Sequence, residues 1–508
     1  MSSLKTHLVI GLLCIWAFAC CAYGQSGPCP TSHSTDTGAP TPQLSGDVIC
    51  VVPQVYGAGG LVGNNHGGPL SPTETGSFSH TVHFQDAALK SLNPITAEIG
   101  TQLSQLPFTS PASGFVFTFN PSAGVVTQTT QSFGPILTER ADTIGRHKLF
   151  VGVSYQFFNF DKIDSTNLRQ FGAVYQHENE TCVEAGPLVI PCQSDGTPLP
   201  TKDFLFTSNR IDLKVHQITA VATFGITNRL DVSVAVPILD VRMSMSSDVQ
   251  IRSFEGSDPA IYNPTCPVCV HQFSSPAAVS GENLFPADAT YGFNHASFAS
   301  AKAANGIGDV VLRGKFEAIK GEKAGLAVGL DVRLPSGDAY NFLGAGTYGI
   351  RPFAAFSYKG RVSPHASIGF QKNGDSVLAG DITNSTATAH MPNVLTFSFG
   401  ADAALAKRIS ATVDFLGQTL FTVNKISPTT FVDYCEKSGC TPTIPKCNCS
   451  YPDIVSSQAS HVIQDSVAVG AKINPTRRLL ITANVLFRVN DAGLHSKPVP
   501  LIGLSYSF

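Results

Sequence analysis

Four groups of side chains in this sequence have the types and spacing that chemistry requires. His365 and Ser367 lie two residues apart, so on a strand they would point to one face as base and nucleophile. Cys266 and Cys269 have the Cys-x-x-Cys spacing of a thiol–disulfide redox pair. The other two groups are candidate metal ligands, namely Cys435, Cys440, Cys447 and Cys449, and His80 with His83. The elements that carry these residues decide between chemistry and a structural role.

The cysteines favour disulfide bonds over redox or zinc chemistry. Cys266 follows Pro264 in a Ser/Pro-rich stretch and does not start a helix after a strand, as a redox pair would. Thirteen cysteines become ten when Cys14, Cys20 and Cys21 leave with the expected leader, and an even number in an exported chain indicates disulfides. The disulfide candidates are Cys29, Cys50, Cys182, Cys192, Cys266, Cys269, Cys435, Cys440, Cys447 and Cys449.

Alternating hydrophobicity dominates the C-terminal two-thirds of the chain. Between positions 326 and 334, Leu and Val at every second position alternate with Ala, Gly, Asp and Arg. Period two collects the apolar residues on one face of a strand, whereas a helix would spread them around its circumference. We expect about twelve such strands, at 148–160, 204–224, 228–247, 307–320, 323–335, 350–359, 361–372, 393–406, 408–422, 462–474, 477–490 and 498–508.

The connections between these strands are sorted by length. Tight turns join the strands in pairs, at 225–229, 320–323, 359–361, 406–408 and 474–477. The connections between pairs are mostly long, at 161–203, 248–306, 336–349, 373–392 and 423–461, with a shorter one at 491–497. Short turns at one end and long loops at the other are typical of outer-membrane barrels. We therefore predict an all-β fold, a transmembrane antiparallel β-barrel of about twelve strands over residues 148–508. Cys29 and Cys50 precede this barrel, and the other mature cysteines fall in its long loops.

Residues 1–24 have the features of a signal peptide. Lys5 supplies a positive charge, residues 8–19 form the apolar core, and Ala22-Tyr23-Gly24 is a cleavage site with small residues. A lipoprotein acceptor at Cys20 or Cys21 is the alternative interpretation.

Residues 25–147 differ in kind from the barrel. They contain a Gly/Pro-rich stretch and, from Asp86, helical spacing that Pro94 interrupts, which predicts one or two short helices. We expect this segment to form a plug in or beneath the barrel mouth. A hairpin within residues 115–134 could instead raise the number of barrel strands to fourteen.

The composition narrows the functional classes. A formal net charge of −3 gives no electrostatic support for nucleic-acid binding, so nucleic acid is not an expected partner. Charged residues make up 14% of the chain, against roughly 25% in soluble domains. Low charge at moderate hydrophobicity is typical of a barrel that alternates apolar and polar residues. Outer-membrane lipid is therefore the expected surrounding.

The last strand ends on an aromatic residue. Ile502, Leu504, Tyr506 and Phe508 share one face, which predicts a row that faces lipid. Gly503, Tyr506 and Phe508 also resemble the terminal signal that the barrel-assembly machinery recognises, although Leu501 stands where that signal prefers a polar residue. We expect that machinery to be a partner.

The face opposite the lipid row predicts which polar residues line the lumen. Both signs of charge occur there, which fits either internal ion pairs or the lining of a pore. The candidates are Gly308, Asp309, Arg313, Lys315, Asp331, Arg333, His365, Asp402, Asp414 and Arg488. Because His365 and Ser367 belong to this inner face, they cannot attack lipid from the outer wall, as a barrel phospholipase does, and we predict no catalytic residues.

Two stretches resemble a family of bacterial outer-membrane transporters that includes proteins associated with meta-pathway phenol degradation. They are "NGIGDVVLRGKFEAIKGEKAGLAVGLDVRLPSGD" at 305–338 and "FGPILTERADTIGRHKLFVGVSYQFFNFDKID" at 133–164. The resemblance covers roughly residues 133–508, with the long-chain fatty-acid channel as a distant relation. It implies a passive channel of the Gram-negative outer membrane for a small, hydrophobic or aromatic solute, without a cofactor or metal. The alternatives are a non-conducting adhesion barrel that acts through its loops and an outer-membrane lipid hydrolase.

Overall fold

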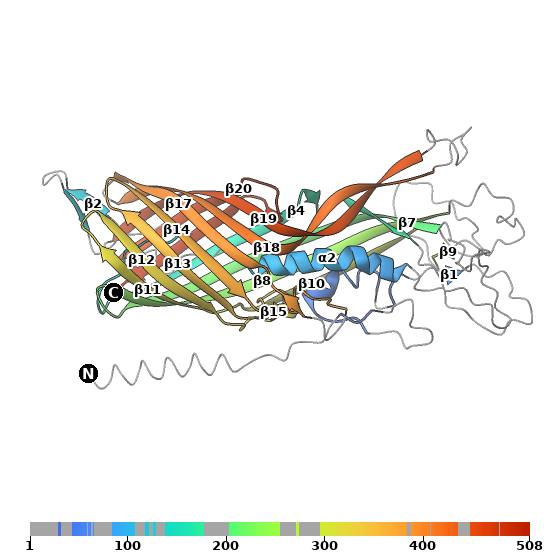
Figure 1. The fold of residues 1–508 in the computed structure, drawn as a ribbon, viewed down its shortest axis with the longest axis horizontal. Coiled ribbons are helices and arrows are strands. Elements are labelled where there is room, and N and C mark those ends of the chain that lie inside the picture. The colour runs from blue at the N-terminus through green and yellow to red at the C-terminus, as the bar shows by residue number, and fades with distance from the viewer. Residues whose placement is uncertain are drawn as a thin grey trace, which may run out of the picture.

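The fold is known from a computed structural model (Figure 1). It describes residues 29–31, 43–57, 59–61, 64–65, 84–106, 117–120, 125–128, 138–176, 203–253, 271–273, 295–383, 388–406, 408–434, 448–476 and 478–508. The expected signal peptide, His80, His83 and the Cys266–Cys269 pair lie outside these residues, and so do Cys182, Cys192, Cys435, Cys440 and Cys447.

Twelve antiparallel strands form a closed barrel, which confirms the predicted fold class and strand number. Each strand pairs with the next in chain order, and β22–β4 and β7–β8 pairing completes the ring. The strands are β4 (Leu149–Ile163), β7 (Asp203–Gly225), β8 (Leu230–Ser253), β11 (Val311–Lys320), β12 (Ala324–Arg333), β13 (Gly349–Tyr358), β14 (Val362–Asn373), β17 (Asn393–Ala406), β18 (Ile409–Tyr434), β19 (Asn448–Thr476), β20 (Leu479–Arg488) and β22 (Val499–Ser507).

The alternative of fourteen strands is wrong. The suspected hairpin does form, from β2 (Phe117–Asn120) and β3 (Val125–Gln128), but these strands pair only with each other. Two further pairs are also separate from the barrel, β1 (Asn64–Asn65) with β9 (His271–Gln272), and β15 (Asp375–Ser376) with β16 (Ala389–His390).

The ends of the barrel are sorted as the sequence predicts. One end, which we call the turn end, carries the tight turns, the start of β4 and the chain terminus at Phe508 (Figure 1). The opposite end, which we call the loop end, carries all the long connections. Short extra strands join the sheet toward the loop end, namely β5 (Thr166–Asn167), β6 (Phe171–Gln176) and β21 (Leu494–Ser496).

Three features near the loop end differ from the sequence prediction. Strand β10 (His295–Ile307) pairs with the distal part of β8 and continues toward β11, but it is rich in Ala and Ser and therefore lacks the alternation of a barrel strand. Strands β18 and β19 extend past the predicted loop boundaries as one long hairpin. As a consequence, Cys449 lies in β19 opposite Asp433 and not in a loop.

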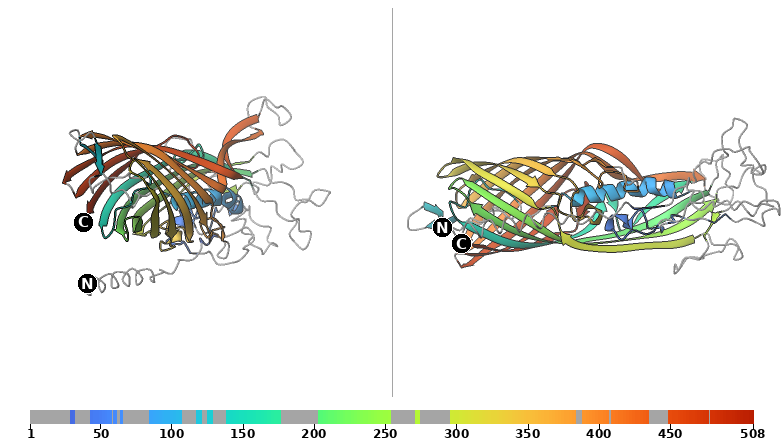
Figure 2. Two further views of the ribbon diagram at one scale, coloured as in Figure 1. Left: turned by 60° about the vertical axis from the view of Figure 1, so that its left-hand side comes forward. Right: turned by 90° about the horizontal axis from the view of Figure 1, so that it is seen from below.

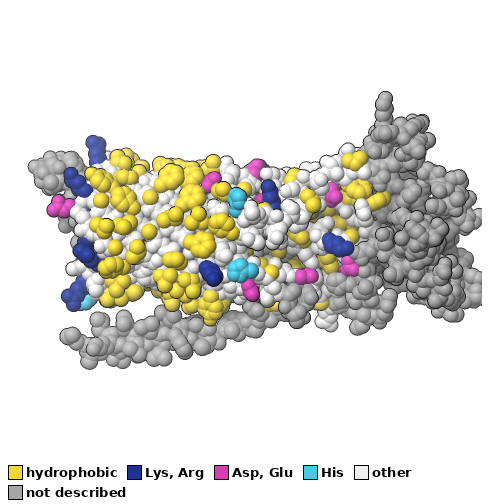
Figure 3. Space-filling model, in the orientation of Figure 1, with side chains coloured by type: hydrophobic (Ala, Val, Ile, Leu, Met, Phe, Trp, Pro, Cys, Tyr) yellow, Lys and Arg dark blue, Asp and Glu magenta, His cyan; other side chains and the backbone are white. Residues whose placement is uncertain are grey.

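An apolar belt surrounds the half of the barrel near the turn end. It runs from Ile218 of β7 to Ile226, just past the end of this strand; these two residues are 41% and 40% exposed, and His216 is the next outward residue toward the loop end. Nine residues at about 3.3 Å, tilted by about 45°, give a height of roughly 20 Å, close to that of outer-membrane barrels. Figure 3 shows this belt as yellow side chains, with charged residues and histidines near mid-length. Among the described helices, none is long and apolar enough to cross a bilayer.

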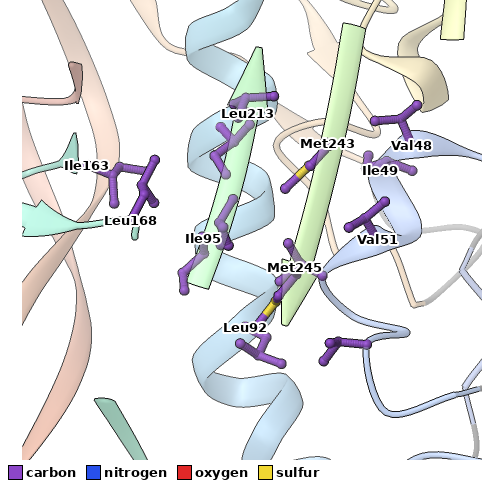
Figure 4. Close-up of a cluster of buried hydrophobic side chains, with 14 of the residues drawn as sticks. Val48, Ile49, Val51, Leu92, Ile95, Ile163, Leu168, Leu213, Met243 and Met245 are labelled. Carbon is purple, nitrogen blue, oxygen red and sulfur yellow. The ribbon is translucent and has the colours of Figure 1, made fainter. Parts of the chain in front are cut away.

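The lumen toward the loop end contains a hydrophobic plug. Its elements are the 3-10 helix η1 (Val48–Val51), the helix α2 (Gln85–Leu103) and an inward-folded loop with η3 (Ala339–Asn341). Figures 1 and 2 show α2 beside the long wall strands toward the loop end, and Figure 4 shows Leu92 and Ile95 beside Leu213 of β7 and Met243 and Met245 of β8. These side chains are almost completely buried, so the plug shares one apolar core with the wall.

The plug helix is continuous through Pro94. A proline inside a helix has no N–H to donate to the carbonyl four residues earlier, here that of Lys90. Lys90 and Pro94 line an open groove, where this carbonyl can bond to water. One helix therefore replaces the two short helices that were the other expectation.

A disulfide joins Cys29 to Cys50 within the plug core. Both cysteines are fully buried, so this bond strengthens the plug and does not staple an exposed loop.

Candidate functional site: a lumen pocket between the plug helix and buried ion pairs

Residues 138–145 fold into the lumen near the turn end, just before β4. Glu139 pairs with Arg313, and with Lys315 at 3.1 Å between Oε1 and Nζ. Lys315 Nζ also donates to the backbone oxygens of Arg140 and Asp142 at 3.1 and 2.7 Å. All these groups are buried. The inner wall thus holds this segment, which we call the inner segment, by charge-assisted hydrogen bonds.

A second part of the inner segment reaches the opposite wall. Arg140 pairs with Asp402, which also accepts from Lys472 Nζ at 2.7 Å. Asp414 beside them accepts from His365 Nε2 at 2.7 Å. The ion pairs therefore cross the lumen from β11 to β17, β18 and β19 near the turn end.

His365 and Ser367 do not form a catalytic pair. The His365 ring contacts Asp414, whereas the Ser367 hydroxyl shares a hydrogen bond with Ser398 at 2.7 Å. Neighbours two residues apart on a strand point the same way but lie about 6–7 Å apart, too far for proton transfer.

Gly308, Asp309 and Arg333 organise the inward-folded loop. Asp309 accepts from the backbone N–H groups of Gly337 and Ala345 at 3.0 and 2.7 Å. Arg333 lies 3.6 Å from the Asp309 carboxylate and donates at 2.9 Å to the backbone oxygen of Ser104, just past α2. A side chain at Gly308 would collide with the backbone of Leu343 at 2.9 Å. This corner therefore connects the wall, the loop and the plug helix.

A pocket lies in the lumen where α2 ends. Its cavity volume is about 70 Å³. Side chains of the wall supply an apolar surface, from Phe158, Phe160, Leu416 and Leu486. The rings of Phe158 and Phe160 are nearly parallel, with centroids 5.9 Å apart. Their strands β4, β18 and β20 are distant in sequence and meet only through barrel closure.

A chain of hydrogen bonds links the plug helix to the polar side of this pocket. Gln102 of α2 accepts from Gln464 and from the backbone N–H of Leu494. Gln464 accepts in turn from Gln418 and, at 3.5 Å, from Arg488. The end of the plug helix therefore fixes the orientation of the amides that face the pocket.

Two unpaired amides lie one step closer to the turn end. Gln156 and Asn484 are 1% and 3% exposed, and neither amide has a hydrogen-bond partner among the residues that the structure describes. Both flank Leu501 in the β4–β22–β20 register. Buried polar atoms without a protein partner normally bond to water or ligand.

The carboxyl groups of Glu98 and Asp164 connect α2 to the wall on the side of Gln102 away from the pocket. Glu98 accepts from Gln102 Nε2 at 2.8 Å and faces Asp164, which accepts from the backbone N–H groups of Gly493 and Ile426. Burial raises the pKa of the Glu98 carboxyl well above its usual range, and the Asp164 carboxyl adds to the increase. A protonated Glu98 can donate to Asp164, and this bond would tie the plug helix to the wall.

The structure separates the predicted lumen residues into three places. Arg313, Lys315, Asp331, His365, Asp402 and Asp414 belong to the ion-pair network, and Gly308, Asp309 and Arg333 to the loop corner. Arg488 alone lines the pocket. Sequence reasoning missed Leu416, Leu486 and the glutamines, because an apolar or amide residue on an inner face gives no separate signal in one sequence. In the last strand Ile502, Leu504 and Phe508 face outward, and Gly503 faces inward beside Thr482.

The closed ring, the apolar belt and the polar lumen define a membrane-spanning β-barrel of the outer-membrane type. Residues 211–426 match the model of the family described as "Putative MetA-pathway of phenol degradation", in agreement with the resemblance found in the sequence.

Several solved structures match this chain at low sequence identity. An outer membrane channel from Pseudomonas putida F1 is 10% identical, with 74% of this chain and 100% of that chain covered and a TM-score of 0.39. A FadL homologue from Pseudomonas aeruginosa is 11% identical, with 79% and 98% covered and a TM-score of 0.29. The CymD monoaromatic hydrocarbon channel is 9% identical, with 72% and 89% covered and a TM-score of 0.24. No curated protein matches the sequence significantly.

Proposed function

We propose that this protein is an outer-membrane channel that binds a small, mainly apolar solute in the lumen pocket and passes it passively. The observation that carries the proposal is the pocket itself. Six apolar side chains converge inside the barrel, between the plug on one side and the ion pairs on the other. A purely structural barrel has no need of such a space, because interiors normally pack without voids.

The proposed route begins at the loop end, which faces the cell exterior in barrels of this type. A groove of about 480 Å³ runs there along α2, lined by Lys90, Pro94 and Asp381 among others. A solute that passes along α2 reaches the pocket at the end of the helix. It leaves toward the periplasm when the inner segment moves aside. Export by a signal peptide at residues 1–24, assembly by the barrel machinery and the remaining loop disulfides belong to the same proposal.

Filling the pocket tests this proposal. Leu416→Trp adds a ring to the apolar side of the pocket, whereas Val413→Trp adds the same ring on the lipid face of the same strand, where Val413 is 53% exposed. We expect Leu416→Trp to weaken the binding of toluene at least about 10-fold in calorimetric titrations of the folded barrel, since one apolar body cannot share the space. Val413→Trp should bind as the wild type does. Equal binding in both variants would refute a pocket at this place.

A non-conducting barrel that acts through its loops is the remaining alternative. The ion pairs across the lumen favour this alternative if they keep the lumen permanently blocked. The conductance of Glu139→Gln, which removes one of the buried charges of these ion pairs, separates the two functions.

A further inference from the structure

Arg488 differs from the other arginines of the lumen in its surroundings. Arg140, Arg313 and Arg351 each contact an aspartate directly, and Arg333 lies 3.6 Å from Asp309. Among the described residues, no carboxylate lies within 4 Å of the Arg488 guanidinium, and Arg488 is the one charged residue in the lining of the pocket. Its charge is therefore available to a ligand.

The hydrogen bonds of Arg488 also leave capacity for a ligand. Nη2 donates to the backbone oxygen of Ala492 at 2.8 Å, and Nη1 makes only a long contact of 3.5 Å with Gln464 Oε1. Nε is buried and has no acceptor. Two nearby acids are engaged elsewhere, since Asp491 pairs with Lys162 at 2.8 Å and Asp465 accepts from Asn490 at 3.2 Å. A guanidinium with unused donors is suited to a planar oxyanion.

The opposite side of the pocket is suited to an apolar body. Phe158, Phe160, Leu416 and Leu486 provide the surface, and the lining contains no acidic side chain that would repel an anion. The pocket's 70 Å³ is less than the roughly 150 Å³ of a cavity that holds benzene. A single ring therefore occupies the pocket only in part and extends beyond it.

We infer that the pocket selects small amphipathic carboxylates, with an apolar body of about one ring on Phe158 and Phe160 and the carboxylate on Arg488. This inference rests on the proposed function and specifies its class of solute. The carboxylate takes the place that Gln464 Oε1 holds weakly, and the bidentate geometry of the guanidinium distinguishes it from an amide or a hydroxyl group. Loss of a charge-assisted bond of this kind typically reduces affinity by about 10- to 100-fold.

Calorimetric titration of the folded barrel at pH 7 with three probes tests the inference. Benzoate carries the charge, benzamide has nearly the same shape without it, and toluene has the ring alone. We expect the wild type to bind benzoate at least about 10-fold more tightly than benzamide. Arg488→Gln should abolish this preference and leave toluene binding unchanged, and Arg488→Lys should restore part of it. Arg478→Gln, on the exposed turn before the same strand, is the matched control and should behave as the wild type.

The outcomes separate the inference from the proposed function. If toluene binds but benzoate and benzamide bind equally, or if Arg488→Gln keeps the preference, the inference is overturned and the apolar pocket remains. If none of the three probes binds the wild type, the proposed function fails with it. The comparison of benzoate with benzamide in the wild type needs no variant, so a misfolded Arg488 variant would not prevent a decision.

Discussion

Replacing Glu139 by Gln should open the lumen at the turn end. Glu139 holds the inner segment to β11 through Arg313 and Lys315, and the side chains of these three residues are 7%, 4% and 1% exposed. The amide keeps the shape of the carboxylate but removes its charge. While the inner segment is docked, Arg313 and Lys315 then lack a buried negative partner. When the segment is undocked, both side chains are open to water and need no such partner. The cost therefore falls on the closed state.

The size of the effect follows from the contacts that remain. Removing one partner of a buried ion pair costs roughly 3–5 kcal/mol. Arg313 still contacts Asp331 at 2.6 Å, and Lys315 keeps two backbone acceptors, so we expect a value near the lower limit, about 3 kcal/mol. At 1.4 kcal/mol for each factor of ten, the ratio of open to closed states should increase about 100-fold.

Single-channel recording in planar bilayers measures this ratio. Glu322→Gln, in the exposed turn that follows β11, removes the same charge without a buried partner and should record as the wild type. Gel mobility before and after heating establishes that each variant is a folded barrel. A folded Glu139→Gln barrel with the open probability of Glu322→Gln would refute the reasoning, because the network would then stabilise the wall without closing the lumen. Persistent absence of conductance in both would favour the non-conducting alternative.

Two further predictions concern the plug. Because the pKa of Glu98 is raised, its carboxyl stays protonated while α2 is docked, and docking of α2 should weaken as pH increases above about 4.5, where an undocked glutamate ionises. Hydrogen exchange of residues 84–106 between pH 5 and 8 should show this weakening in the wild type and in Glu322→Gln but not in Glu98→Gln. An equal pH dependence in all three proteins would contradict the prediction. Replacing Cys29 by Ser should lower the stability of the plug by about 3 kcal/mol, since the disulfide spans 21 residues. The plug should then be cleaved by protease faster than in the oxidised wild type, and Cys50→Ser should be cleaved at the same rate as Cys29→Ser.

Much of the barrel could be predicted from the sequence because its signal is local. The alternation of Leu326, Val328 and Leu330 with Gly329 and Asp331 requires only that one side of a strand meets lipid, and this condition holds in every strand that crosses the apolar belt. The number of strands, the positions of the turns and the outward row of the last strand followed from that pattern. The same pattern failed beyond the belt, where water surrounds the wall and β10 has no need of an apolar face.

The site was decided by tertiary structure alone. Glu139 lies 174 positions before Arg313, and Gln102 meets Gln464 across 362 positions, so no spacing rule connects either pair. The sequence identified Arg488 as an inner-face residue, but only the plug helix and three wall strands make its surroundings apolar and free of carboxylates. Alternation specifies a face, because side chains of a strand repeat every two residues. Which residues share a pocket depends on how the ring closes and on where the N-terminal segment folds inside it.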